Sequence, residues 1–242
     1  MLSREFLLDR GYCCGHGCLM CPYIPKHTKD NTVTTNTKTR YKWGRFPVEL
    51  INHNGLAWKD KQYGVAIIHT PKCASTTIRA HILKDGPCNL NDFKDEEYKV
   101  MAVMRNPSDR FFSGITTALH SNSDVCFFSD SKYKEGTWKE KLLYALHHVK
   151  HEKYYNIHIV PQVWFHNDRE GDPFPIQKYL KFEDFNKEIQ RALSLDLYPV
   201  NANKTPIHEV GIMELKGDPE VESAIREAYA EDFECYNLNI GQ

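Results

Sequence analysis

The residues whose types and spacing first suggest chemistry lie in the stretch 65–77, VAIIHTPKCASTT. We expect a buried strand over Val65–His69, a tight turn over Thr70–Lys72, and a helix that begins with Ser75–Thr77. This order brings unpaired backbone N–H groups and the positive end of a helix dipole to one point, where an anion, most often a phosphate, binds. Lys72 adds a positive charge, and three hydroxyls add hydrogen-bond donors. The glycine-rich loop G-x-x-x-x-G-K-[ST] is not present, because its glycines are missing and the lysine precedes the small residues.

A second stretch, 99–114, reads KVMAVMRNPSDRFFSG. The apolar run Val100–Met104 predicts another buried strand, and the proline two residues after Arg105 favours the first turn of a helix. Arg105 stands at the carboxyl end of the strand. Ligands of open α/β sheets bind beyond the carboxyl ends of the strands. We therefore expect Lys72 and Arg105 to face the same crevice, and Ser113, on the following helix, to reach the same anion.

Together, the motifs PKCASTT and RNPSDRFFS resemble those of the sulfotransferases that use the sulfate donor PAPS (3′-phosphoadenosine 5′-phosphosulfate), and most closely those of the carbohydrate branch. In that family the first motif holds the 5′-phosphosulfate, and an Arg and a Ser of the second motif hold the 3′-phosphate. Many members carry glycine where this chain has Cys73 and Ala74, although small non-glycine residues also occur there. The resemblance implies a PAPS site made of Lys72, Cys73, Ala74, Ser75, Thr76, Thr77, Arg105 and Ser113.

The resemblance extends over about residues 63–240, with less specific motifs. His158 and Gln162 match an H-x-x-P-Q stretch that often follows the family's next helix, expected here over Trp138–His151. A polar turn at 201–206 resembles a late loop near the donor, which adds Lys204 to the expected donor-binding residues. A strand over 179–182 and a closing helix over 221–237 also have counterparts in the family. In that helix we interpret three side chains as core and surface residues rather than ligands: Tyr229, Asp232 and Tyr236.

Sulfuryl transfer from PAPS is an in-line displacement at sulfur, in which positioning and charge stabilisation do most of the work, as in phosphoryl transfer. We expect Lys72 to neutralise the charge that develops on the bridging oxygen of the leaving nucleotide. A His or Glu would take the proton of the acceptor hydroxyl. His158 is our first choice as this base, because it lies in the H-x-x-P-Q stretch, and His69, Glu183 and His120 are the alternatives. The scheme requires no divalent metal, and the acceptor is expected to be a saccharide or another small hydroxyl compound.

Two other functions are compatible with these motifs. A nucleotide kinase-like enzyme could use a related loop, but the Walker glycines are missing and no Asp/Glu pair is obviously placed for Mg²⁺. A non-catalytic module could bind a nucleotide through the same loop and carry a metal at its N-terminus. The sulfotransferase is the favoured hypothesis, because Lys72, Arg105 and Ser113 are all present.

Half of the eight cysteines lie near the N-terminus, within RGYCCGHGCLMCPY. Four thiolates in so short a span suit tetrahedral Zn²⁺ or an Fe–S cluster, and the flanking glycines permit the sharp turns of a compact chelate. The spacing of the last three also matches the cluster motif of radical-SAM enzymes, but the barrel that should follow is not readable. The stretch resembles a small uncharacterised bacterial domain with the signature C-C-G-x-G-C-x-x-C-P-Y, which implies no activity. The predicted metal ligands are Cys13, Cys14, Cys18 and Cys21.

Composition sets the outer limits of these hypotheses. Hydrophobic residues make up 41% and charged residues 26% of 242 residues, and the net charge is −1, which argues against a broad nucleic-acid surface. No apolar run approaches the length of a membrane span, and the N-terminus lacks a signal-peptide core. We therefore expect a cytoplasmic protein with reduced thiols. The expected organisation is a Cys-rich segment (1–27), a linker and packing segment (28–62), and an α/β three-layer sandwich with a central parallel sheet of four or five strands (63–242).

Overall fold

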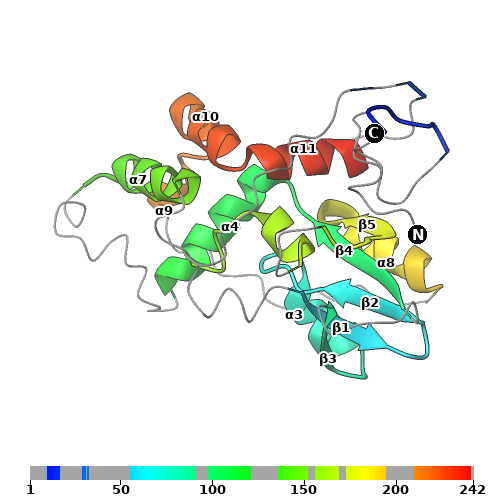
Figure 1. Ribbon diagram of the computed structural model, residues 1–242. Helices are drawn as coiled ribbons and strands as arrows, with labels where there is room; N and C mark the ends of the chain where they lie inside the picture. The colour runs from blue at the N-terminus through cyan, green and yellow to red at the C-terminus, as the bar shows by residue number, and fades with distance from the viewer. Residues whose placement is uncertain are drawn as a thin grey trace. The chain divides into compact units, whose positions relative to one another are not determined.

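In this computed structural model, the described residues are 10–16, 29–30, 32, 55–90, 98–120, 136–151, 156–168, 173–194 and 210–240. The chain divides into two compact units, Met1–Lys42 and Trp43–Gln242. All the helices and strands given below belong to the second unit (Figure 1).

The described strands of the second unit form one mixed sheet. They are β1 (Leu56–Asp60), β2 (Val65–Ile68), β3 (Pro87–Asn89), β4 (Lys99–Met104) and β5 (Lys178–Lys181), in the spatial order β3-β1-β2-β4-β5. β2, β4 and β5 run parallel to one another, whereas β1 runs antiparallel to both of its neighbours. The carboxyl ends of β2 and β4 therefore meet at the same edge of the sheet.

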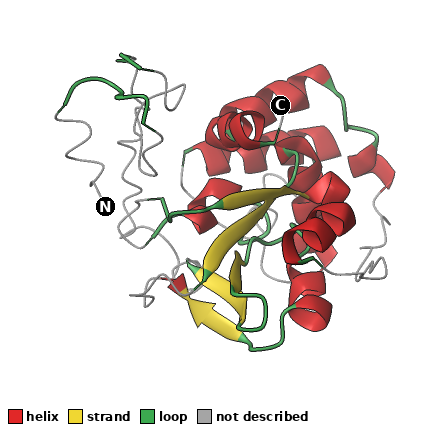
Figure 2. Ribbon diagram, turned by 90° about the vertical axis from the view of Figure 1, so that its right-hand side faces the viewer, coloured by secondary structure: helices red, strands yellow, loops and turns green. Residues whose placement is uncertain are grey.

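Helices account for most of the rest of the described second unit (Figure 2). α3 (Ser75–Thr77) continues directly into a π-helix, η2 (Ile78–Ile82), and α4 (Pro107–His120) follows β4. The longest helix after α4 is α7 (Trp138–Lys150), which begins with a capping box between Thr137 and Glu140. The others are η4 (Gln162–His166), η5 (Phe182–Asp184), α8 (Phe185–Leu193), α9 (Val210–Met213), α10 (Pro219–Ala228) and α11 (Ala230–Asn239).

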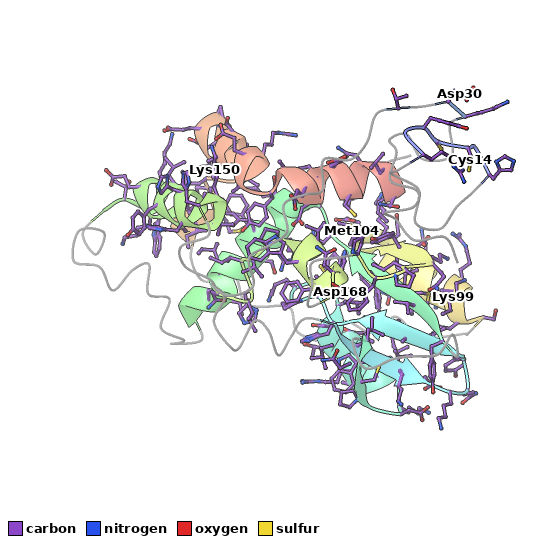
Figure 3. All side chains as sticks on the ribbon, viewed as in Figure 1. Cys14, Asp30, Lys99, Met104, Lys150 and Asp168 are labelled. Carbon is purple, nitrogen blue, oxygen red and sulfur yellow. The ribbon has the colours of Figure 1, made fainter. Side chains whose placement is uncertain are left out.

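Both faces of the sheet are covered by helices. One face packs against η2 and α8 in an apolar cluster that includes Val65, Ile67, Met101, Val103, Ile78 and Ile189. On the other face lies Met104, which Figure 3 labels. Its sulfur atom is 3.5 Å from that of Cys235 on α11. This arrangement confirms the predicted α/β class.

A second apolar cluster joins α4 to α7, α9 and α10, which lie beside α4 in Figure 1. Its fully buried members include Phe111, Ile115, Leu142, Leu146, Ile212, Val221 and Ile225. α4 therefore has one side in a helical core and remains anchored at its start to the edge of the sheet.

The prediction of a parallel sheet was wrong for β1, which lies in the stretch assigned to a linker and packing segment. Only the turn Lys61–Gly64 connects β1 with β2, and strands joined by so short a connection pair antiparallel. Gly64 has φ +60°, a conformation that the turn requires and that glycine adopts readily. β1 was missed because Lys59 and Asp60 interrupt its apolar pattern.

Two predicted helices differ in form from those in the structure. The helix expected to begin with Ser75–Thr77 is present as α3 and η2, and its second part has π geometry. The closing helix expected over 221–237 is two helices, α10 and α11, which break at Tyr229 because this residue has φ −118° and ψ 31°. The helix expected over Trp138–His151 is confirmed as α7, one residue shorter.

Candidate functional site

The loop between β2 and α3 contains two residues in the left-handed region of backbone conformation. φ is 68° at Lys72 and 58° at Ala74, values that cost a non-glycine residue about 1–2 kcal/mol. The amide of Cys73 donates to the carbonyl of Thr70 at 3.1 Å and closes the turn between them. The loop therefore stores backbone strain at the two residues that flank Cys73.

The start of α3 offers a set of backbone donors. The first intrahelical bond runs from the amide of Ile78 to the carbonyl of Ala74 at 3.0 Å. The amides of Ser75–Thr77 precede this bond, and the N-cap residue Ala74 has only a methyl group, which cannot accept a hydrogen bond from them. Amides in this position bind anions at helix N-termini. The predicted order of strand, loop and helix over 65–77 is thus present.

Lys72 extends from this loop to α4. Its ammonium donates to the Oγ1 of Thr117 at 2.6 Å. Partial burial, followed by the positive charges of Arg105 and Arg110, lowers the pKa of Lys72 below its ordinary value. The ammonium is therefore held beside like charges, an arrangement that a bound anion would stabilise.

Arg105 directly follows β4 and reaches the loop. Its Nη1 donates to the carbonyl oxygen of Lys72 at 3.3 Å, and its guanidinium lies 4.5 Å from the ring centroid of Phe182. Burial is the main cause that lowers the pKa of Arg105, but an arginine remains protonated in proteins. The two cations that the sequence singled out therefore lie at one site.

Arg110 is a third cation at this site, and the sequence reasoning missed it. Only 1% of its surface is exposed. Its Nε donates to the carbonyl of Pro71 at 3.1 Å, and its Nη1 donates to the carbonyl of Val160 at 2.6 Å. Among the described residues, its buried Nη2 has no hydrogen-bond partner. Its one sequence signal was its place five residues after Arg105 in RNPSDR, which does not indicate burial.

One face of α4 organises these contacts. Arg110, Gly114 and Thr117 are spaced so that they lie on the same side of the helix. A Cβ at Gly114 would lie 2.9 Å from the carbonyl carbon of His158 and still closer to its oxygen. This close approach requires glycine and places the backbone of His158 against Gly114, the residue after the half-buried Ser113.

The side chain of Gln162 is fully buried and connects three segments of the site. The H-x-x-P-Q resemblance included Gln162 but implied no role for it. Its Oε1 accepts from the amide of Arg105 at 2.9 Å and from the Sγ of Cys73 at 3.2 Å. Its Nε2 donates to the carbonyl of Arg105 at 2.9 Å and to Asp232 at 3.5 Å. The amide group thus joins the end of β4, the loop after β2, and α11.

Asp232 and Tyr229 fix the segment that carries Gln162. Asp232 accepts from the amides of Gln162 and Val163 at 2.8 and 3.0 Å, and the hydroxyl of Tyr229 donates to the carbonyl of Ile159. Burial raises the pKa of Asp232, and the charge of Arg110 and these two amides partly offset that effect. Asp232 is buried rather than on the surface, and it supports a loop of the site.

The thiol of the loop residue Cys73 and the imidazole of His166 are buried as neutral groups. Burial raises the pKa of Cys73 to about 11. Burial, with a smaller contribution from Arg110, lowers the pKa of His166 to about 3. The Nε2 of His166 lies 3.2 Å from the Oγ1 of Thr70. At neutral pH neither group adds charge to the site.

The four candidate bases lie in different environments. His158 is half-buried beside α4, and its amide donates to Asn156 Oδ1 at 2.9 Å. His69 is half-buried between β2 and the loop, and its amide donates to the carbonyl of Leu56. Glu183 is exposed and accepts from the amide of Asn106 and the hydroxyl of Tyr236. The side chain of His120 lies outside the described residues, as does Lys204.

In the first unit, the described residues include two of the four predicted metal ligands. Cys13 is buried and Cys14 is half-buried, and the carbonyl of Cys13 accepts from the amide of Asp30, which Figure 3 labels together with Cys14. Cys18 and Cys21 lie outside the described residues. Within the described part of the chain, no three His, Cys, Asp or Glu side chains gather as a metal site. The four-cysteine site therefore stays a prediction.

Comparison with known proteins found no matching family model, no matching curated protein and no matching solved structure. Of the described helices, none combines the length and the apolar character needed to cross a membrane.

Proposed function

We propose that this protein is a PAPS-dependent O-sulfotransferase that transfers a sulfuryl group to a hydroxyl of a saccharide or another small acceptor. The observation that carries the proposal is the hydrogen bond from Arg105 to the backbone of Lys72, 3.3 Å long. PAPS has a phosphate on the 3′ carbon of its ribose and a phosphosulfate on the 5′ carbon. A site for this donor must bind two anionic groups that are a fixed distance apart. The bond between Arg105 and Lys72 holds the two cationic motifs at a fixed distance from each other.

In this proposal the loop 70–74 and the first turn of α3 form a P-loop-like site for the 5′-phosphosulfate. The α3 amides and the hydroxyls of Ser75–Thr77 would bind its oxygens, and Lys72 would neutralise the charge on the leaving oxygen. The partial burial of Lys72 suits this role, because weaker solvent screening strengthens its attraction to an oxygen that becomes more negative during the reaction. Arg105 and Ser113 would hold the 3′-phosphate.

His158 is the base that fits this proposal best. Its backbone lies against Gly114, the neighbour of Ser113 on α4. Glu183 fits less well, because both of its carboxylate oxygens already accept hydrogen bonds. Proton transfer to a positioned His typically contributes a factor of about 10²–10⁴ to the rate.

The direct test of catalysis is transfer of sulfur-radiolabelled PAPS to a panel of saccharides and other hydroxyl compounds. The proposal predicts a labelled product with the wild-type protein. Lys72→Ala should lower turnover far more than donor affinity. Lys139→Ala, which removes a lysine paired with Asp218 and Glu220 away from the loop, is the control and should transfer label at the wild-type rate. Equal transfer by Lys72→Ala and the wild type would refute the role of Lys72.

A further inference from the structure

We propose that the side-chain amide of Gln162 is a positioning group that couples the two halves of the anion site. It would do so by holding the backbone of Arg105 and the loop that contains Lys72 at a fixed distance from each other. The inference rests on the proposed function for its ligand, but its structural part concerns the hydrogen bonds of Gln162 alone.

The first step is the end of the sheet. The pairing of β2 with β4 ends at Ala102, and the pairing of β4 with β5 ends at Met104. Arg105 comes after both ladders, yet its N–H and its carbonyl both pair with the amide of Gln162 at 2.9 Å. The side-chain amide therefore replaces the neighbouring strand as the hydrogen-bond partner of Arg105 and fixes the backbone one residue beyond β4.

The second step is the link to the loop. The same Oε1 that accepts from Arg105 also accepts from the Sγ of Cys73 at 3.2 Å. Cys73 stands between Lys72 and Ala74, the two loop residues with positive φ. A displacement of Gln162 would therefore shift both Arg105 and the strained part of the loop.

The third step is that the hydrogen bonds of Gln162 allow only one orientation of its side-chain amide. A primary amide has two donors and two acceptor lone pairs. Here the donors serve Arg105 and Asp232, and the lone pairs serve Arg105 and Cys73. A flipped amide would place N–H groups against the amide of Arg105 and oxygen against its carbonyl and the carboxylate of Asp232. The complete set of bonds fixes Gln162 and, through it, the separation of the two cationic groups.

Hydrogen exchange tests the structural part in the full chain. We expect the Arg105 amide of the wild type to be as protected as the amides of β4, although it lies beyond the strand. In Gln162→Met, which keeps the side-chain length and removes every hydrogen bond, the Arg105 amide and the amides of 73–78 should exchange about tenfold faster or more. Thr116→Val is the matched control, because it removes one buried bond of α4, from Oγ1 to the carbonyl of Phe112, and should leave these amides unchanged.

A double-mutant cycle tests the coupling. Gln162→Met should weaken binding of PAP (the desulfated product of PAPS) about tenfold or more. The loss caused by Arg105→Lys should be smaller in the Gln162→Met background than in the wild type, because Arg105 is already displaced there. If Gln162 were needed only for folding, the losses of PAP affinity caused by Gln162→Met and Arg105→Lys would add in the double variant.

The outcomes separate three claims: the positioning role of Gln162, its coupling of Arg105 to the loop, and the proposed function. Fast exchange of Arg105 in the wild type, or unchanged exchange in Gln162→Met, overturns the positioning role whatever the ligand is. Additive losses overturn the coupling. If the wild type binds no PAP, the proposed function fails, and the exchange data still decide the structural role of Gln162. If Gln162→Met does not fold, the protection of Arg105 in the wild type decides it.

Discussion

The guanidinium of Arg105 and the carbonyl of Lys72 form a hydrogen bond 3.3 Å long between Nη1 and the oxygen. The two residues are 33 positions apart: Lys72 lies in the loop after β2, and Arg105 directly follows the neighbouring parallel strand β4. Neither side chain neutralises the other, since both are cations. Their proximity therefore makes sense as a site for an anion rather than as an ion pair that stabilises the fold.

The charge on Lys72 should lower the stability of the ligand-free protein. Its folded pKa lies below the unfolded value of 10.5, so the unfolded chain binds more protons between these two values, and wild-type stability rises with pH in that window. Lys72→Met, which keeps the length and removes the charge, should raise the free energy of unfolding at pH 7 by about 1 kcal/mol. The gain should shrink as the pH approaches 10.5.

Urea denaturation of the wild type and Lys72→Met at pH 7 and at pH 10 measures this effect. Lys139→Met is a control at an ion-paired lysine, and should show no gain. A Lys72→Met protein that is less stable than the wild type at pH 7 would show that the bond to Thr117 outweighs the charge repulsion.

Arg105 should determine affinity for PAP. Arg105→Ala removes a charge-assisted partner of the 3′-phosphate and should weaken PAP binding about tenfold or more, whereas Arg105→Lys should lose less because it keeps the charge. Calorimetric titration measures both. Arg191→Ala, which removes an exposed arginine paired with Glu188 on α8, should bind as the wild type does. Unchanged affinity in Arg105→Ala would refute the assignment.

Gly114 should tolerate no larger residue. In Gly114→Ala the new methyl would press on the carbonyl of His158, and relief would require α4 to move from the segment that carries His158. Overpacking of this kind costs about 1–3 kcal/mol. Chemical denaturation should show this loss, while Ser113→Ala, one residue earlier and without added atoms, should stay near the wild-type midpoint. A wild-type midpoint for Gly114→Ala would contradict the close contact.

The N-terminal cysteines should hold one metal. We expect metal analysis of the protein purified without chelator to find one equivalent of Zn, or iron with sulfide if a cluster is bound. Cys13→Ser should reduce this content, because a thiolate ligand is lost, and Cys88→Ser, at a cysteine of β3, should retain it. Metal content that is independent of Cys13 would remove it from the ligand set.

The sequence was most informative where the apolar pattern of a strand and a predicted anion-binding motif lie in the same stretch. The apolar runs predicted β2 and β4, and β2 and the loop-helix after it are present over 65–77. Because two parallel strands end at one edge, the sequence also predicted that Lys72 and Arg105 would meet. β1 was not predicted, because its strand conformation depends on pairing with β2 rather than on its own composition.

The burial of the polar residues that support the loops of the site could not be predicted. Arg110, Gln162 and Asp232 are fully buried, whereas residues of these types are mostly exposed. Their burial depends on partners up to 70 positions away, such as the amide of Gln162 for Asp232. Long-range pairing of this kind leaves no local pattern in one sequence.

The central claim is that the site binds the PAPS nucleotide without a metal. Calorimetric titration of the wild type with PAP in the absence of divalent metal tests it most directly, with ATP and Mg²⁺ as the comparison. The account predicts tight PAP binding without metal and binding about tenfold weaker or more in Arg105→Ala. Binding of ATP with Mg²⁺ but not of PAP would contradict it and would indicate a phosphoryl-transfer enzyme instead.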